Sequence, residues 1–168
     1  MPPPLRRVAP VNEMEHIHAL IASPEDSNVV YVATHLGLVA GFNKSDFEYD
    51  WWYINDEDFD FTGFWLDPEQ PSIMYTFAHP TAHEETGIRR SDDRAQTWEL
   101  ITSRPDPHKT VVSQTEPYTI YSLDFPTFAL VKSDDKGSSW KVLDSPSESP
   151  MHSLAVNPVN SFEILAGT

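Results

Sequence analysis

The sequence predicts an all-β fold, a partial β-propeller with about three and a half four-stranded blades. Three observations lead to this prediction. Short apolar runs recur in a constant register about every 44 residues, a polar turn motif recurs after 42 residues, and no long segment keeps the apolar spacing of an amphipathic helix. A β-sandwich also consists of short strands, but it offers no reason for the constant register, so the repeats favour propeller blades.

The first repeat is an apolar run, a proline turn and a second apolar run. It is clearest where the run 20–22 precedes Pro24 and the run 29–32 follows it. Each second run has an anchor seven residues after the proline, or after Gln114 in a weaker copy. The anchors are Tyr31, Tyr75, Tyr121 and Leu165. These β-rich runs predict the first two strands of four successive blades.

The second repeat is the polar turn motif, which we expect to join the last two strands of a blade. The segments 91–98 and 133–140 both fit Ser-x-Asp-x-Gly-x-Ser/Thr-Trp, except that Ala95 replaces glycine. Serine and aspartate can accept hydrogen bonds from turn amides, glycine permits a positive φ, and tryptophan covers the hairpin. Alanine there is expected to strain the turn by roughly 1 kcal/mol. The residues expected to have this structural role are Ser91, Asp93, Thr97, Trp98, Ser133, Asp135, Gly137, Ser139 and Trp140.

These motifs resemble the Asp-box (BNR) repeats of sialidases, sortilin-type receptors, xyloglucan-cleaving hydrolases and photosystem assembly propellers. The chain is more closely similar to short bacterial Asp-box propellers commonly labelled glycosyl hydrolases. Four ordered motifs carry this similarity, which extends over residues 14–168: His-Ile-His-Ala-Leu at 16–20, Ala-Thr-His-Leu-Gly-Leu at 33–38, Asp-Phe-Thr-Gly-Phe at 60–64 and Ala-His-Pro at 78–80. Ala19 and Ala78 stand where that group usually has glycine. The resemblance implies a sialidase-like superfamily, glycosyl hydrolase-like activity and secreted relatives.

The repeats divide the chain into an N-terminal extension, residues 1–13, and a partial propeller, residues 14–168. The blades are expected at about 16–54, 61–101, 108–143 and 151–168, and the last is incomplete because the chain stops within its second strand. We therefore expect a fragment of a larger propeller. Open blade edges carry unpaired N–H and C=O groups, which predicts closure by further sequence or self-association with a second copy.

Composition excludes several classes of protein. The formal net charge is −15, with 26 acidic and 11 basic residues. Such a field repels phosphate backbones, so nucleic-acid binding is not expected. No apolar run approaches the roughly 20 residues of a membrane span, and the first residues show no signal peptide. Without cysteine there are no disulfides and no thiolate chemistry. The compartment stays open.

Histidines occupy equivalent positions of the repeat. Six residues before each proline position lie His18, Thr62, His108 and His152, and four residues after the anchors lie His35, His79 and Phe125. The first two strands of a blade form a hairpin, so we expect His18 and His35 to be cross-strand neighbours at one mouth of the propeller. Asp60 is their expected acidic companion. The full candidate set is His16, His18, His35, Asp60, His79, His108 and His152.

Neutral imidazoles grouped with a carboxylate are typical ligands of Zn²⁺ and similar divalent cations. The histidine columns therefore predict a metal or small-ligand site, which should lose its ion below about pH 6 because imidazoles then protonate. The alternative is a ring of hydrogen-bonding residues that closes the inner strands. His83, in the loop 80–86, is expected to be exposed only.

Three functions remain open. The leading hypothesis is a binding or scaffold module with a histidine-lined funnel for a metal or small ligand, and its possible partners include a carbohydrate or a protein. The resemblance implies instead a glycoside hydrolase, and a third possibility is an assembly factor that docks by its acidic face. Catalytic residues stay unassigned, because the arginines do not form the cluster of a sialidase and spacing alone pairs no two acids across blades. The acids considered are Asp56, Glu57, Asp58, Asp60 and Asp124.

Overall fold

The structure is a computed structural model that describes residues 6–8, 14, 16–46, 48–54, 59–67, 69–80, 85–103, 106–114, 119–125, 127–143 and 151–168. All regular elements within these ranges are β-strands. The same ranges contain no helix that is long and apolar enough to cross a membrane. The all-β prediction is therefore confirmed.

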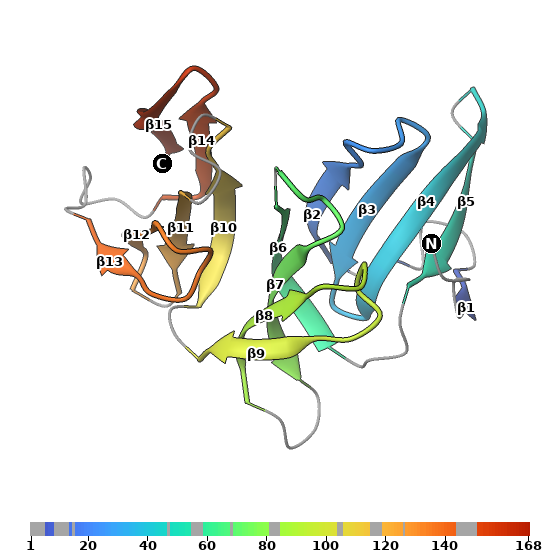
Figure 1. Cartoon of the computed structure of the whole chain (residues 1–168), viewed down its shortest axis with the longest axis horizontal. Coiled ribbons are helices and arrows are strands. Elements are labelled where there is room, and N and C mark those ends of the chain that lie inside the picture. The colour runs from blue at the N-terminus through green and yellow to red at the C-terminus, as the bar shows by residue number, and fades with distance from the viewer. Residues whose placement is uncertain are drawn as a thin grey trace.

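The strands form four antiparallel sheets (Figure 1). The first contains β2 (Ile17–Ala22), β3 (Val29–Thr34), β4 (Gly37–Ser45) and β5 (Glu48–Tyr53). The second contains β6 (Phe59–Leu66), β7 (Met74–Pro80), β8 (Gly87–Ser91) and β9 (Glu99–Thr102). The third contains β10 (Pro107–Val112), β11 (Ile120–Asp124), β12 (Ala129–Ser133) and β13 (Lys141–Val142). The fourth is the hairpin of β14 (Ser153–Asn157) and β15 (Asn160–Gly167).

The sheets follow one another like blades around a common centre (Figure 1). β2, β6, β10 and β14 are the innermost strands, and each contacts the next along the chain. The predicted anchors all lie on the second strand of their sheets: Tyr31 on β3, Tyr75 on β7, Tyr121 on β11 and Leu165 on β15. The constant register of the sequence thus reflects equivalent strands.

An additional strand, which the repeats do not predict, lies at the outer edge of the first sheet. β1 (Arg6–Arg7) pairs antiparallel with β5. The Arg7 guanidinium binds Asp50 at 2.7 Å, and that of Arg6 lies 4.2 Å from the centroid of the Tyr53 ring. These contacts cover the outer edge of β5, which would otherwise offer unpaired backbone groups.

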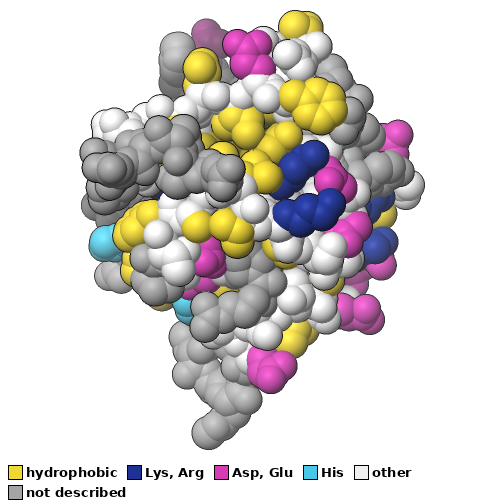
Figure 2. All heavy atoms as spheres, turned by 90° about the vertical axis from the view of Figure 1, so that its left-hand side faces the viewer, with side chains coloured by type: hydrophobic (Ala, Val, Ile, Leu, Met, Phe, Trp, Pro, Cys, Tyr) yellow, Lys and Arg dark blue, Asp and Glu magenta, His cyan; other side chains and the backbone are white. Residues whose placement is uncertain are grey.

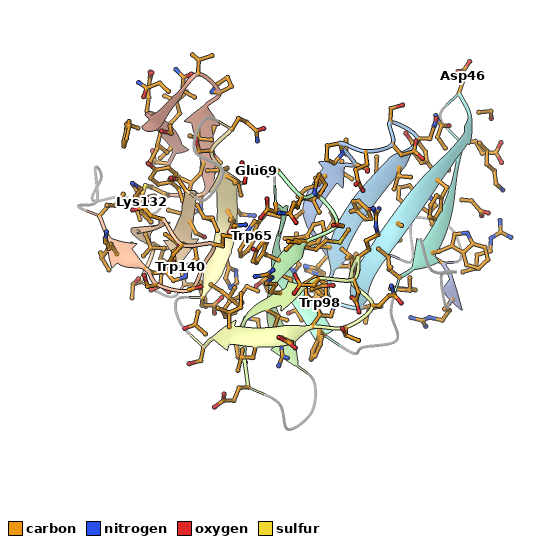
Figure 3. The ribbon with its side chains drawn as sticks, viewed as in Figure 1. Asp46, Trp65, Glu69, Trp98, Lys132 and Trp140 are labelled. Atoms are coloured by element: carbon orange, nitrogen blue, oxygen red, sulfur yellow. The ribbon has the colours of Figure 1, made fainter. Side chains whose placement is uncertain are left out.

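The hydrophobic core lies between neighbouring sheets. Phe61 of β6, Trp98 of the turn after β8 and Tyr31 of β3 belong to the cluster that joins the first two sheets. Trp65 projects from β6 to the other side (Figure 3), where its ring stacks on Tyr75 with 5.5 Å between centroids, and this second cluster includes Ile120 of the third sheet. The inner strand of a blade therefore packs alternate residues against both neighbours.

The fourth sheet exposes large apolar side chains. Val159, Phe162 and Leu165 are 82%, 72% and 70% exposed. Figure 2 shows this side of the molecule, where hydrophobic side chains gather beside basic ones. Lys132 Nζ lies 5.5 Å from the centroid of the Phe162 ring. Apolar side chains grouped at the surface are typical of a face that packs against another element.

The turn between β8 and β9 is built by the polar motif at 91–98. Ser91 Oγ accepts a hydrogen bond from the Ala95 amide at 2.8 Å, and Asp93 Oδ1 accepts one from the Thr97 amide at 2.9 Å. Thr97 Oγ1 donates to the other Asp93 oxygen at 2.7 Å. Ala95 is fully buried and has a φ of 67°. It thus adopts the left-handed conformation that its place in the motif requires.

The turn between β12 and β13 repeats these bonds. Ser133 Oγ accepts from the Gly137 amide at 2.9 Å, and Asp135 Oδ1 accepts from the Ser139 amide at 2.7 Å. Gly137 has a φ of 88°, equivalent to that of Ala95. The Trp140 indole Nε1 donates to the Gly137 carbonyl at 2.9 Å and closes the turn.

Replacing Gly137 by alanine is expected to lower the free energy of unfolding by about 1 kcal/mol. A Cβ there would lie 3.5 Å from Ile88 Cγ2, an ordinary contact, so space is not the obstacle. The cost comes from the positive φ, which an L-residue with a Cβ adopts unfavourably. Urea denaturation of the two proteins measures the difference, and equal stability of the alanine variant would contradict this account.

Candidate metal-binding site

An irregularity repeated in three blades builds the mouth between the inner strands. The hydrogen-bonded register between the first two strands of a sheet shifts at His18 in β2, at Thr62 in β6 and at His108 in β10. Each is the extra residue of a β-bulge, and bulges redirect side chains at functional sites. His18 therefore lies outside the regular backbone pairing of β2 with β3, and its side chain lies close to that of His35. Their ring centroids are 4.6 Å apart.

The first candidate site brings two histidines of the first sheet to an aspartate of the second. His18 lies on β2, His35 follows the end of β3, and Asp60 lies on β6. Asp60 Oδ1 is 2.7 Å from His35 Nδ1 and 3.6 Å from His18 Nε2. One ligand atom from each residue lies within 4.8 Å of the others. The side chains are 19% to 37% exposed, so the site is open at one side.

Two of these ligand atoms have unmet bonding capacity. His18 Nε2 and Asp60 Oδ1 are buried, and neither makes a hydrogen bond of regular geometry within the described part of the chain, although Asp60 Oδ1 lies 2.7 Å from His35 Nδ1. Buried polar atoms of this kind are rare and call for an explanation such as an ion. Burial lowers the pKa of His18, the nearby His35, His108 and Lys109 lower it further, and Asp60 opposes them. A lowered pKa keeps the imidazole neutral, which is the form that binds metal.

His16 lies beside this group. It is exposed, and its ring centroid is 4.7 Å from that of His35. Its φ is 44°, in the left-handed region that non-glycine residues rarely adopt. Such strain is most often found at functional sites.

A second group contains an aspartate that the sequence reasoning missed. His79 lies near the end of β7, Asp106 directly precedes β10, and His108 is the bulge residue of β10. The signal for Asp106 was present, since it stands two residues before His108 just as Asp60 stands two residues before Thr62. Their ligand atoms also lie within 4.8 Å of one another.

The remaining members of the predicted columns surround these groups. Thr62 is buried, and the ring of Phe125 packs on His108 with 4.7 Å between centroids. His152 is exposed and lines, with His18 and His108, a cavity of about 340 Å³ between the inner strands. Among the described residues it belongs to neither three-ligand group.

Of the other acids considered, the structure describes Asp124. Asp56, Glu57, Asp58 and His83 lie outside the described residues. The Asp124 carboxylate binds neighbouring parts of the chain instead: its Oδ1 accepts a hydrogen bond from the Asp106 amide at 2.8 Å, and its Oδ2 accepts one from Thr127.

Comparison with known proteins bears on the fold. No protein-family model matches the sequence, and no similar curated protein is found. The similar solved structures include an ancestral GH74 enzyme, which has a TM-score of 0.65 and 17% identity; the match covers 94% of this chain and 22% of that one. They also include a GH74 enzyme of Niastella koreensis, which has a TM-score of 0.52 and 13% identity; the match covers 83% of this chain and 24% of that one. The chain spans less than a quarter of either structure. Together with the four sheets, this likeness shows that the chain has the fold of part of a β-propeller.

Proposed function

We propose that this chain is a metal-binding module of an Asp-box β-propeller, and that His18, His35 and Asp60 hold a divalent transition-metal ion such as Zn²⁺. Two imidazoles and one carboxylate are a ligand set that Zn²⁺ accepts in proteins. The observation that carries the proposal is the convergence of their ligand atoms within 4.8 Å, from three separate strand regions. The bonds of the two polar turns support the Asp-box assignment.

Three protein ligands leave one position of a four-coordinate ion open. Three protein ligands and one open position are typical of Zn²⁺ sites that bind water or substrate. His16 is the residue placed to fill that position, because its ring faces His35 at 4.7 Å between centroids and the side chain is exposed. The alternative, a ring of hydrogen-bonding residues, is weakened because His18 Nε2 and Asp60 Oδ1 make no hydrogen bond of regular geometry among the described residues.

A glycoside hydrolase acting on carbohydrate is the second candidate, and the likeness to two GH74 enzymes favours it. Such an enzyme needs two carboxyl groups flanking the scissile bond. Asp60 and Asp106 each contact histidines instead: Asp60 lies against His35, and Asp106 Oδ1 lies 2.9 Å from His108 Nε2. For this reason metal binding is the better supported function.

The test is metal uptake by the purified chain. After chelator treatment and dialysis against Zn²⁺ at pH 7.5, His35→Ala is expected to retain one ion fewer per chain than the unmodified protein. His35 is 37% exposed, so its loss should change the free energy of unfolding by less than about 0.5 kcal/mol.

The matched control is His152→Ala, which removes a histidine from the same mouth without touching either three-ligand group. It should retain as much Zn²⁺ as the unmodified protein. Equal retention by the His35→Ala variant and the unmodified protein would overturn the proposal.

A further inference from the structure

We propose that the chain carries a second, separate site for a divalent transition-metal ion, formed by His79, Asp106 and His108 at the junction of the second and third sheets. Asp106 Oδ2 is 3.5 Å from His79 Nε2, and Asp106 Oδ1 is 2.9 Å from His108 Nε2. The carboxylate therefore offers one oxygen to each imidazole. This proposal rests on its own ligands and does not depend on the first site.

The Asp106 carboxylate is held in place by its backbone. Its amide donates to Asp124 Oδ1 at 2.8 Å, and its carbonyl accepts from the Phe125 amide at 2.8 Å. The side chain is only 14% exposed. A carboxylate fixed in this way between two imidazoles loses little conformational freedom when an ion binds, which favours binding.

The ligand atoms have the same unmet bonding capacity as those of the first site. Asp106 Oδ1 and His108 Nε2 are buried and lie 2.9 Å apart, and neither makes a hydrogen bond of regular geometry within the described ranges. The rings are supported from behind, because Phe77 packs against His79 and Phe125 against His108, with centroids 5.2 and 4.7 Å apart. An ion bound by the three residues would satisfy the buried atoms.

The two sites are related by the repeat. His79 is the counterpart of His35 at the end of the second strand of a blade, and Asp106 is the counterpart of Asp60 before the bulge of the next blade. They differ in the third ligand. The first site uses a bulge histidine of its own blade, His18, whereas β6 has Thr62 at that position and the second site uses His108 from the next blade.

Both ions would border one cavity. His18 and His108 line the same space of about 340 Å³ between the inner strands. The second site has three protein ligands, so its open position is available to a ligand in that cavity. The structure thus predicts two Zn²⁺ ions per chain rather than one.

Counting ions separates the two proposals. With Zn²⁺ as the probe at pH 7.5, elemental analysis after dialysis should find two ions in the unmodified chain, one in Asp106→Asn, one in His35→Ala and none in the double variant. Asp106→Asn keeps the shape of the side chain and both backbone hydrogen bonds. His79→Ala should also retain one ion. The His79 side chain is 38% exposed, so this variant tests the same site without changing Asp106 and its structural contacts.

The outcomes are distinguishable. Two ions in both Asp106→Asn and His79→Ala would overturn the second site while leaving the first untouched. Two ions in His35→Ala, with one in Asp106→Asn, would overturn the first site and keep the second. A lower count in His152→Ala would overturn the proposed ligand set, and no ion in the unmodified chain would overturn both sites.

Discussion

Replacing Phe61 by alanine is expected to lower the free energy of unfolding by about 3–5 kcal/mol, the usual cost of removing a buried phenylalanine. Phe61 is fully buried between the first two sheets. Its ring centroid lies 5.6 Å from that of Trp98 and 6.0 Å from that of Phe59. The substitution would leave a cavity at a junction of two blades, where neither sheet can close it without shifting.

Urea denaturation followed by tryptophan fluorescence measures this loss. The matched control is Phe162→Ala, which removes the same side chain where it is 72% exposed. It should change stability by less than about 0.5 kcal/mol. A loss below 1 kcal/mol for Phe61→Ala would contradict the view that blade–blade junctions hold the fold together.

Replacing Lys136 by methionine is expected to cost about 2–3 kcal/mol at pH 7. Lys136, in the turn after β12, binds Asp67 at 2.7 Å in the preceding blade, and the Asp67 side chain is only 1% exposed. Removing the ammonium leaves a buried carboxylate without its cation, which is strongly destabilising. The hydrogen bonds that Asp67 accepts from two backbone amides keep the cost below that of a fully orphaned charge.

The repeat supplies the control for this variant. Arg94 occupies the position of Lys136 in the preceding blade and binds Glu25 at 2.7 Å, but the two side chains are 37% and 40% exposed. Exposed ion pairs contribute little, so Arg94→Met should cost less than about 1 kcal/mol. Equal losses for the two variants would contradict the dependence on burial.

The effect of Lys136→Met should depend on pH. Burial by itself would raise the pKa of Asp67, but hydrogen bonds from Lys136 and from the amides of Glu69 and Gln70 hold it below its usual value. A depressed folded-state pKa means stabilisation that is present above the unfolded pKa of about 3.9 and is lost as the pH falls through the folded value. The difference between the two proteins should therefore be largest near neutral pH and shrink below about pH 4.

The blades could be predicted from the sequence because each repeat must bury alternate residues against two neighbours. This requirement keeps the spacing from proline to anchor constant, and the recurring turn motif places Ala95 at a position with positive φ. β1 could not be predicted, because two arginines carry no apolar signal and their pairing depends on β5.

The candidate site could be predicted only in part. The histidine columns follow from the repeat, but the bulges do not, because an extra residue in one strand shows only in the pairing with its partner. Asp106 was missed because it lies next to Pro107, outside any apolar run. Its relation to His108 is visible only when Asp60 and Thr62 are aligned with it.

The residue at each bulge can differ between blades without changing how the blades pack. Because His18, Thr62 and His108 each stand outside the regular pairing, the residues before and after them keep their alternation towards the two flanking blades. Threonine can therefore replace histidine at this position without any change to the interlocking faces. The residue at each bulge, and with it the ligand set of each proposed metal site, can therefore be changed in one blade at a time.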